Sequence, residues 1–296
     1  LIQFGVFDGP SSLNLENSSY SISSFVSDWD ETRYKEAFDQ VLAYIEAGDI
    51  YQANLTFSLF ADFEGDPWTF YKDLQLKQKV KHGAFVDLDS EISILSRSPE
   101  LFFKTDSKMN ISTRPMKGTQ PRDRDVEKDK KNLKFLKNDI KNRAENLMIV
   151  DLLRNDISRI SKVGTVKVPE LYKVETYETV HQMTSLIIGE MNKKTTVAEL
   201  FAALFPCGSI TGAPKIRAME IIHELEKRPR DIYCGTIGWM APDGSSEFNV
   251  AIRTLLMQNG KAVLNVGGGV VFDSTSSSEY EEALWKSRFT QISEKT

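Results

Sequence analysis

The stretch RPMKGTQPR, residues 114–122, places Lys117 between two prolines and directly before Gly118 and Thr119. Proline fixes its own φ and keeps the preceding residue extended, so the pattern predicts a stiff loop on both sides of Lys117. Gly118 allows a ligand to approach the backbone closely. A lysine held in this way can act as a nucleophile where its surroundings keep the amine neutral. The alternative is an exposed loop lysine without a chemical role, and the rest of the chain must decide between the two.

Composition limits the classes of protein to which the chain can belong. Its 296 residues, 41% of them hydrophobic, suffice for one large core or for two domains of ~150 residues. The net charge of −5 predicts no general attraction to nucleic acid or to an anionic membrane, and no apolar run reaches the ~18 residues of a membrane span. With two cysteines and three histidines, neither a disulfide framework nor a histidine-built zinc site is expected.

The N-terminal region carries few structural signals. The chain starts with Leu1 rather than Met and shows no signal peptide, so we expect a trimmed or incompletely ordered N-terminus and a cytoplasmic location. Residues 1–27 are rich in Ser and Asn and predict an irregular or edge-strand lead-in, which could be the remnant of a longer N-terminal region.

Periodicity and turn residues predict the elements of the first half. Helices are expected at about residues 31–47, ended by Gly48, and at 67–78, with a turn and a strand at 48–55 between them. Ser98-Pro99-Glu100 interrupts a predicted meander of short strands at residues 84–88, 92–97, 101–104 and 109–113.

The second half begins with a long charged helix, predicted at about residues 123–161 and broken once. Its charge run at 127–131 is expected to be a solvated face, and its apolar stripe is expected to consist of Leu133, Leu136, Ile140, Ala144 and Leu147.

The remaining elements are two helices and three long strands, followed by a last helix. The helices are predicted at 195–205 and 214–226, and the strands at 233–241, 247–257 and 261–272, the last two joined by the hairpin signal Asn259-Gly260. Ser278 and Glu281 match a capping box for the last helix, to about Ser293. No internal repeat or flexible linker is visible, so the sequence predicts a single α+β domain, residues 1–296, built on large antiparallel sheets.

Acidic residues on two predicted helices are candidate metal ligands. Glu145 lies near the edge of the apolar stripe, and it fits either a boundary residue that reaches solvent or a ligand of a hard cation such as Mg²⁺. Glu282 and Lys286 are four residues apart on the last helix and share a face with Glu279. They fit either a surface ion pair or a site in which Glu282 reaches a metal and Lys286 a substrate carboxylate.

Other candidates lie in or near the predicted strands. The run Gly267-Gly268-Gly269 weakens a strand, and it fits a bulge, tight packing or a close ligand. Residues 208–215 resemble an anion-binding turn before a helix, without the ending of a P-loop. Arg253 breaks an apolar run, and a buried arginine requires an anion such as a carboxylate. Tyr233 and His181 are possible polar contacts, although each alone is more typical of a structural position.

Taken together, these motifs resemble those of the chorismate-binding enzymes. The resemblance covers roughly residues 30–290 in the family's order and rests on SPE (98–100), PMKGT (115–119), RAENLMIVDLLRND (143–156), GSITGAPK (208–215), GGG (267–269) and EYEEALWK (279–286). It implies one α+β domain with two large antiparallel sheets and the active site between them.

Within this family the resemblance favours the branch that aminates chorismate at C4 to 4-amino-4-deoxychorismate, on the route to para-aminobenzoate and folate. Lys117 stands where anthranilate synthases typically carry alanine, and Gln52 stands where isochorismate and salicylate synthases carry a base lysine. Met116 departs from the usual isoleucine and conserves its volume. The implied enzyme is a transferase that acts on chorismate. The alternatives are an anthranilate synthase, which also eliminates pyruvate, and a non-catalytic chorismate-binding regulatory subunit.

The resemblance also implies a role for each matched residue. Lys117 would be the nucleophile at C2 and Glu100 the general acid for the departing C4 hydroxyl. Glu145 and Glu282 would hold Mg²⁺ against the ring carboxylate. The enolpyruvyl carboxylate would be held by Arg253, Tyr233 and the backbone of Gly267, Gly268 and Gly269, with Lys286, Gly118, Thr119 and Thr211 completing the anion cradle. His181 matches a histidine implicated in pyruvate elimination in anthranilate synthases, an elimination not expected here.

The implied reaction needs ammonia. Neither Cys207 nor Cys234 lies in a glutaminase-like nucleophile motif, and the family precedent is a separate glutamine amidotransferase subunit. We therefore expect such a partner, with no nucleic acid and no membrane involved.

Overall fold

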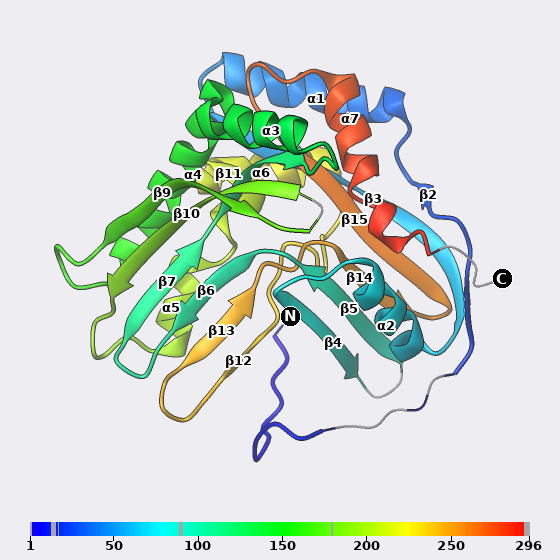
Figure 1. Cartoon of the computed structure of the whole chain (residues 1–296), viewed down its shortest axis with the longest axis horizontal. Helices are drawn as coiled ribbons and strands as arrows, with labels where there is room; N and C mark the ends of the chain where they lie inside the picture. Colours follow the sequence, from blue (N-terminus) through cyan, green and yellow to red (C-terminus); the bar gives the residue numbers. More distant parts are fainter. Residues whose placement is uncertain (1, 13–15, 17, 89–90, 179, 293–296) are drawn as a thin grey trace.

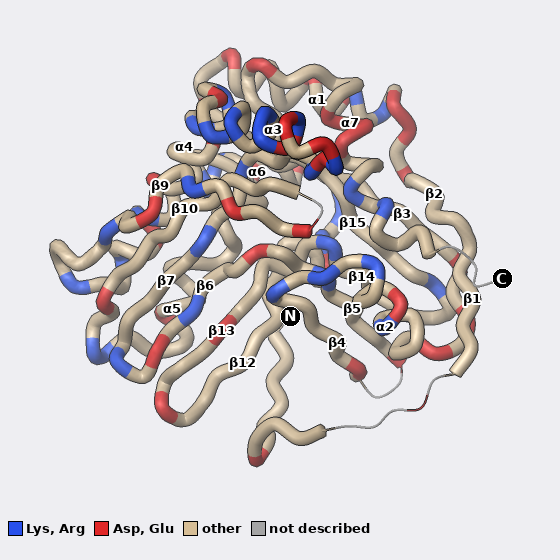
Figure 2. Tube along the Cα trace, in the orientation of Figure 1, with Lys and Arg blue, Asp and Glu red and all other residues tan. Residues whose placement is uncertain are grey.

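Two antiparallel β-sheets form the body of the computed structural model, which describes residues 2–12, 16, 18–88, 91–178 and 180–292 (Figure 1). The predicted α+β architecture with two antiparallel sheets is confirmed. Within these ranges, no helix combines the length and the apolar character that crossing a bilayer requires. Figure 2 shows both signs of charge distributed over the molecule and interspersed along helix α3 (Val126–Asn138). On that helix the exposed pair Glu127 and Lys130 confirms that the charge run is solvated.

The first sheet has eight strands in the part of the chain that the structure describes. Two short strands, β2 (Val26–Ser27) and β11 (Gly212–Ala213), pair with β3 beside the main path. The main path runs in the order β1 (Tyr20–Ile22), β3 (Gln52–Gly65), β15 (Lys261–Val270), β14 (Thr254–Gln258), β5 (Ile92–Ser98) and β4 (His82–Leu88).

The second sheet has seven strands over the same described ranges. Strand β9 (Lys167–Thr176) pairs with β10 beside the main path. That path runs in the order β12 (Gly238–Met240), β13 (Ser246–Asn249), β6 (Leu101–Thr105), β7 (Asn110–Arg114), β10 (Val180–Glu190) and β8 (Met116–Pro121).

Each sheet has its own helices and its own hydrophobic core. The first packs against α1 (Glu31–Glu46), α2 (Pro67–Lys77), α6 (Lys215–Glu226) and α7 (Ser276–Trp285). The second packs against α3 and α4 (Ile140–Ser158), and α5 (Val197–Leu204) lies against α4. Two 3₁₀ turns, η1 (Gly208–Ile210) and η2 (Arg288–Thr290), complete the elements.

Local signals predicted several elements well. The Asp30 side chain accepts a hydrogen bond from the Arg33 backbone N–H and begins α1, as an N-cap does. The expected lead-in supplies the short edge strands β1 and β2. Asn259 and Gly260, with φ of 52° and 71°, form the turn of the β14–β15 hairpin, because such a turn requires left-handed backbone at both positions.

The predicted meander is wrong in its topology. Strands β4 and β5 belong to the first sheet, whereas β6 and β7 belong to the second, and the chain changes sheets at Ser98-Pro99-Glu100. The predicted strand at 247–257 divides in the same way into β13 and β14, because Arg253 adopts a φ of 50° that a strand does not accommodate. Both of these changes of sheet therefore lie at candidate site residues, the first at Glu100 and the second at Arg253.

Other boundaries also differ from the prediction. Strand β3 extends to Gly65, β9 and β10 were not predicted, and residues 233–237 are not a strand. Ser278 does not cap α7, which follows Thr275. Asp139 ends α3 and caps α4 by accepting a hydrogen bond from the Asn142 N–H, and this break resets the helical phase. The buried face of α4 is therefore Ile149, Val150, Leu153 and Ile157, whereas Ile140 and Leu147 of the predicted stripe are exposed.

Candidate active site

Lys117 lies in an edge strand rather than in the predicted loop. Strand β8 pairs with β10, and the register places Thr119 opposite Gln182 and Met116 opposite Thr184. Lys117 and Gly118 of β8 therefore lie opposite a single residue of β10, which is the pattern of a β-bulge. Gly118 has a φ of 79°, a conformation that glycine adopts without strain.

Hydrogen bonds fix this bulge. The Gln182 amide donates to the Gly118 carbonyl at 2.8 Å, and the Thr119 hydroxyl donates to the Gln182 Oε1 at 2.9 Å. On the other side, a Cβ on Gly118 would lie 2.5 Å from Asn142 Oδ1 of α4. The side chain of Lys117 is thus presented from a rigid segment of the second sheet.

Lys117 meets two residues of the first sheet. Its Nζ lies 3.1 Å from the point that a Cβ on Gly269 would occupy, and Gln52 Nε2 lies 2.8 Å from the same point. Gln52 has no exposed surface, and within the described residues neither polar atom of its amide has a hydrogen-bond partner. A buried amide without partners costs about 1–3 kcal/mol, so this arrangement is typical of a site that a ligand completes.

Glu100 is a buried acid close to Lys117. Only 5% of the residue is exposed, and burial raises the pKa of its carboxyl to about 7, although the hydrogen bond from Ser209 and the charge of Lys117 act in the opposite direction. The Ser209 hydroxyl donates to Glu100 Oε1 at 2.7 Å. The Val250 N–H donates to the Glu100 carbonyl at 3.1 Å, and this bond joins the two points at which the chain changes sheets. Glu100 can therefore carry a proton near neutral pH.

Glu279 of α7 is influenced by two other carboxylates, Glu282 of the same helix and Glu145 of α4. Burial raises the pKa of Glu279, and the negative charges of Glu282 and Glu145 raise it further. Burial also acts to raise the pKa of Glu282, but Lys286 outweighs this effect and holds the pKa below its usual range. Lys286 Nζ lies 2.8 Å from Glu282 Oε1 and donates to the Gly267 carbonyl at 2.8 Å.

This acidic group fits a magnesium site in its chemistry. Mg²⁺ takes one or two carboxylates and keeps several waters, and a divalent cation would relieve the repulsion that raises the pKa of Glu279. Among the residues that the structure describes, no three acidic, histidine or cysteine side chains form a ready-made metal cage. Glu145 and Glu282 thus offer the few carboxylates that magnesium requires, without a complete set of protein ligands.

The three consecutive glycines have different surroundings. A Cβ on Gly267 would lie 2.2 Å from the Leu55 carbonyl oxygen, so this glycine permits close strand packing. A Cβ on Gly268 would lie 2.8 Å from Glu279 Oε2 and 3.6 Å from Lys286 Nζ. Gly268 and Gly269 therefore face charged or polar side chains, whereas the atom nearest to Gly267 is a backbone oxygen.

Tyr233 is buried and Arg253 is partly buried near the change of sheets. Burial lowers the pKa of Arg253, and no described residue pairs with its guanidinium. Burial raises the pKa of Tyr233 well above its usual value. A partly buried arginine without an acidic partner among the described residues is available to an anionic ligand.

Several candidates have their side chains engaged within the protein. His181 lies between Asp129 Oδ1 at 2.9 Å and Thr176 Oγ1 at 3.0 Å, so both ring nitrogens have partners. The Thr211 hydroxyl donates to the Cys207 carbonyl at 3.2 Å. Lys215, at the end of the expected anion-binding turn, pairs with Asp156 at 2.5 Å. Each of these three side chains thus has a partner within the protein, and the roles expected for His181 and Thr211 stay predictions.

Sequence reasoning did not single out Ser209 as a partner of Glu100. Its position within residues 208–215 was the available signal, but that motif was assigned to anion binding. Asn142 beside Gly118 carried no signal, since an asparagine near a helix start is usually a local capping residue.

Known proteins match both the sequence and the fold. The chain is 44% identical over 267 residues to aminodeoxychorismate synthase component 1 of Escherichia coli (strain K12), a match that covers 89% of this chain and 58% of the relative. It is 38% identical over 264 residues to anthranilate synthase component 1 of Thermus thermophilus, covering 89% of this chain and 57% of the relative. The crystal structure of anthranilate synthase component I from Streptococcus pneumoniae TIGR4 superposes with a TM-score of 0.83 at 32% identity, covering 90% of this chain and 59% of that one.

The matches leave a large part of each relative uncovered, because the chain spans less than three fifths of their length. A family model described as chorismate binding enzyme matches residues 8–291, which is nearly the whole chain. The chain therefore belongs to the chorismate binding enzyme family.

Proposed function

We propose that the chain aminates chorismate at C4 to give 4-amino-4-deoxychorismate, in para-aminobenzoate and folate biosynthesis. The observation that carries this proposal is the meeting of Lys117 with Gln52 and Gly269, close enough to Glu100 for the lysine charge to act on its pKa. The relative named aminodeoxychorismate synthase component 1 supports the choice of reaction.

Glu145 and Glu282 would hold Mg²⁺. When bound, the ion neutralises and orients the ring carboxylate of chorismate. The guanidinium of Arg253, which has no acidic partner among the described residues, would bind the second carboxylate, and Tyr233 and Lys286 would be further contacts of the substrate. Gly268 and Gly269 leave room for the ring, since a Cβ at either position would fill the space in front of the charged groups.

Glu100 and Lys117 would carry the chemistry. Protonated Glu100 gives its proton to the C4 hydroxyl, which leaves as water while the neutral Lys117 amine bonds to C2 and the ring double bonds shift. Ammonia then bonds to C4, the double bonds shift back and the C2–nitrogen bond to Lys117 breaks. The new ammonium group returns a proton to the Glu100 carboxylate. Chorismate and ammonia are thus converted to 4-amino-4-deoxychorismate and water, with both residues restored.

Ammonia would come from a glutamine amidotransferase partner. The term "component 1" in the names of the relatives implies a second component. Cys207 and Cys234 are both buried, and burial raises the pKa of each thiol to about 12, so neither is a reactive thiolate for glutamine hydrolysis.

Mass analysis of the products formed from chorismate, Mg²⁺ and ammonium tests the proposal. We expect 4-amino-4-deoxychorismate, no pyruvate, and an adduct at Lys117 that is absent in Lys117→Ala together with amination. Glutamine in place of ammonium should give no product without the partner. Release of pyruvate with fluorescent anthranilate would instead establish an anthranilate synthase, in line with the Thermus relative.

A non-catalytic chorismate-binding subunit is the remaining alternative. Calorimetric binding of chorismate and Mg²⁺ without turnover would support it. Wild-type amination by Lys117→Ala would remove the nucleophile from the mechanism.

A further inference from the structure

A buried chain of hydrogen bonds reaches Glu100 from η1. Ser209 Oγ donates to Glu100 Oε1 at 2.7 Å, and Cys207 Sγ lies 3.2 Å from the same Oγ. All three residues are buried, and the proposed reaction uses only Glu100.

We propose that Ser209, held by Cys207, is a positioning residue that keeps the acidic proton of Glu100 on Oε2. This inference rests on the proposed function, in which Glu100 is the general acid. It goes beyond that function because it assigns the proton to one oxygen and names the residues responsible.

The number of hydrogens on each group fixes which group donates in these two hydrogen bonds. A serine hydroxyl has one hydrogen, and the hydroxyl of Ser209 donates it to Glu100 Oε1. The contact with Cys207 therefore requires the thiol to donate to Ser209 Oγ. Burial and the charge of Glu100 raise the pKa of Cys207 to about 12, so the thiol keeps its hydrogen at neutral pH.

The backbone of η1 cannot easily move away from Glu100. The guanidinium of Arg230 donates to the Ile210 carbonyl at 3.0 Å and to the Asn54 carbonyl of β3 at 2.5 Å, and it pairs with buried Glu226 at 2.6 Å. A Cβ on Gly208 would lie 2.5 Å from Leu152 of α4. The turn η1, which carries Ser209, is thus held against β3 of the first sheet and against α4, which packs on the second.

Glu100 Oε1 consequently accepts a hydrogen bond in both protonation states. When the carboxyl is protonated, its proton is left on Oε2, which accepts no hydrogen bond from the described residues and would give the proton to a leaving hydroxyl. The charged and titratable groups that face Glu100 are Lys117 from β8 and Cys207 from the segment before η1. Ser209 also stabilises the carboxylate that remains after the proton has left.

Infrared difference titration of the chain without substrate tests the proposal. The carboxylic C=O band of Glu100 is identified by its absence in Glu100→Gln. In Ser209→Ala we expect this band to move to higher wavenumber, because its oxygen loses a donor, and its midpoint to rise by about one to two pH units. Ser209→Thr keeps a hydroxyl and should restore both the band and the midpoint.

A second pair of variants keeps the test valid if Ser209→Ala does not fold. Cys207→Ala should move the band and midpoint in the same direction by less, and Cys207→Ser, which keeps a donor, should not. An unchanged Glu100 band and midpoint in both alanine variants would overturn the proposal.

Activity separates this proposal from the proposed function. In an active chain, Ser209→Ala should lower kcat about tenfold with little change in KM, and its pH profile should move with the Glu100 midpoint. If the chain forms no 4-amino product but the infrared band moves as expected, the proposed function fails and the assignment of Ser209 stands. If the chain aminates chorismate and the infrared band does not move, the proposed function stands and the assignment of Ser209 fails.

Discussion

Gly267 and Gly269 are two residues apart in β15, and a methyl group would have different consequences at each. At Gly269 the nearest atoms belong to the side-chain ends of Gln52 and Lys117, whereas at Gly267 the nearest atom is the backbone carbonyl oxygen of Leu55 in β3. We expect Gly269→Ala to fold with a small loss of stability and to lose at least about tenfold in kcat, because Lys117, the proposed nucleophile, is displaced from its position.

Gly267→Ala is the matched control for that prediction. Its Cβ would lie 2.2 Å from the Leu55 carbonyl oxygen, so the strands must separate, at an expected cost of about 1–3 kcal/mol. Urea unfolding and steady-state kinetics of both variants measure the two effects. If Gly269→Ala were as active as wild type, Lys117 would not act from this position.

Glu100 predicts a pH dependence of stability. Its folded-state pKa of about 7 lies above the usual 4.5, so between these values the folded protein binds more protons than the unfolded chain. The stabilising contribution of Glu100 to the unfolding free energy is therefore fully present below pH 4.5 and is lost as the pH rises through 7. Relative to Glu100→Gln, the unfolding free energy of wild type should fall by roughly 3 kcal/mol across this range. If the unfolding free energies of wild type and Glu100→Gln changed in parallel with pH, the raised pKa of Glu100 would be contradicted.

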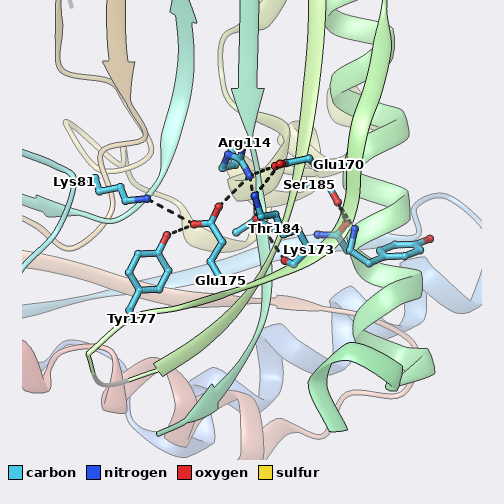
Figure 3. Close-up of polar contacts among 10 residues, drawn as sticks. Lys81, Arg114, Glu170, Lys173, Glu175, Tyr177, Thr184 and Ser185 are labelled. Atoms are coloured by element: carbon cyan, nitrogen blue, oxygen red, sulfur yellow. Dashed lines mark hydrogen bonds and ion pairs between the residues drawn. The ribbon is translucent and has the colours of Figure 1, made fainter. Parts of the chain in front are cut away.

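At the scale of elements, the β9–β10 hairpin is fastened to the strand that leads to Lys117. Figure 3 shows Arg114, the last residue of β7, pointing toward Glu170 and Glu175 of β9, with Lys81 and Tyr177 meeting Glu175 from the other side. Arg114 lies 3.0 Å from Glu175, Tyr177 donates to it at 2.5 Å, and Lys81 lies 3.7 Å from it. Since Lys81 directly precedes β4, the Glu175 carboxylate links the two sheet systems.

We expect Glu175→Gln to lower the unfolding free energy by about 1–3 kcal/mol, because Arg114 and Lys81 lose their shared partner. Burial acts to raise the pKa of Glu175, but the Tyr177 hydrogen bond and the charges of Lys81 and Arg114 outweigh it and keep the pKa below 4.5. The stabilising contribution of Glu175 is therefore present above pH 4.5 and is lost as the pH falls. The difference in unfolding free energy between wild type and Glu175→Gln should thus become smaller in acid.

Glu178→Gln is the control in the same hairpin. Glu178 pairs with Lys79 at 3.0 Å, but both side chains are more than 70% exposed, so the change should cost less than about 1 kcal/mol. Equal losses in the two variants, measured by chemical denaturation, would show that Glu175 has no special linking role.

At the scale of the molecule, the proposed metal ligands come from the two halves. Glu145 lies on α4, which packs against β8 and β10 of the second sheet, and Glu282 lies on α7, which packs against β15 of the first. An ion bound to both would join the halves across the site. Mg²⁺ at about 100 times its dissociation constant should thus stabilise the wild type by ~2.7 kcal/mol, and chelation should remove the gain.

Glu282→Gln should lose most of this response to Mg²⁺, whereas Glu281→Gln, at the adjacent position of the same helix, should keep it. Thermal unfolding with Mg²⁺ and with a chelator measures the difference without any need for substrate. A full response in Glu282→Gln would place the ion elsewhere.

Predictability differed between local and distant features. The bounds of α1 and α2, to within one residue, and the Asn259-Gly260 hairpin followed from neighbouring residues. The strand predicted at 247–257 was divided because Arg253 adopts left-handed backbone at the change of sheets, for which the apolar run Val250–Ala251–Ile252 gave no sign. The apolar stripe failed beyond Asp139 for a similar reason, since one capping side chain reset the helical phase.

The sequence by itself determined the class of fold, the family and the chemical types of the candidate residues, because short motifs carry these in adjacent positions. Only the tertiary structure decided that Lys117 occupies a bulge in an edge strand, that its amine meets Gln52 and Gly269 of the opposite sheet, and that Ser209 holds Glu100. These features depend on burial and on contacts between residues far apart in the chain. The pKa of Glu100, for example, is raised by the removal of water, which requires both halves of the molecule to be folded.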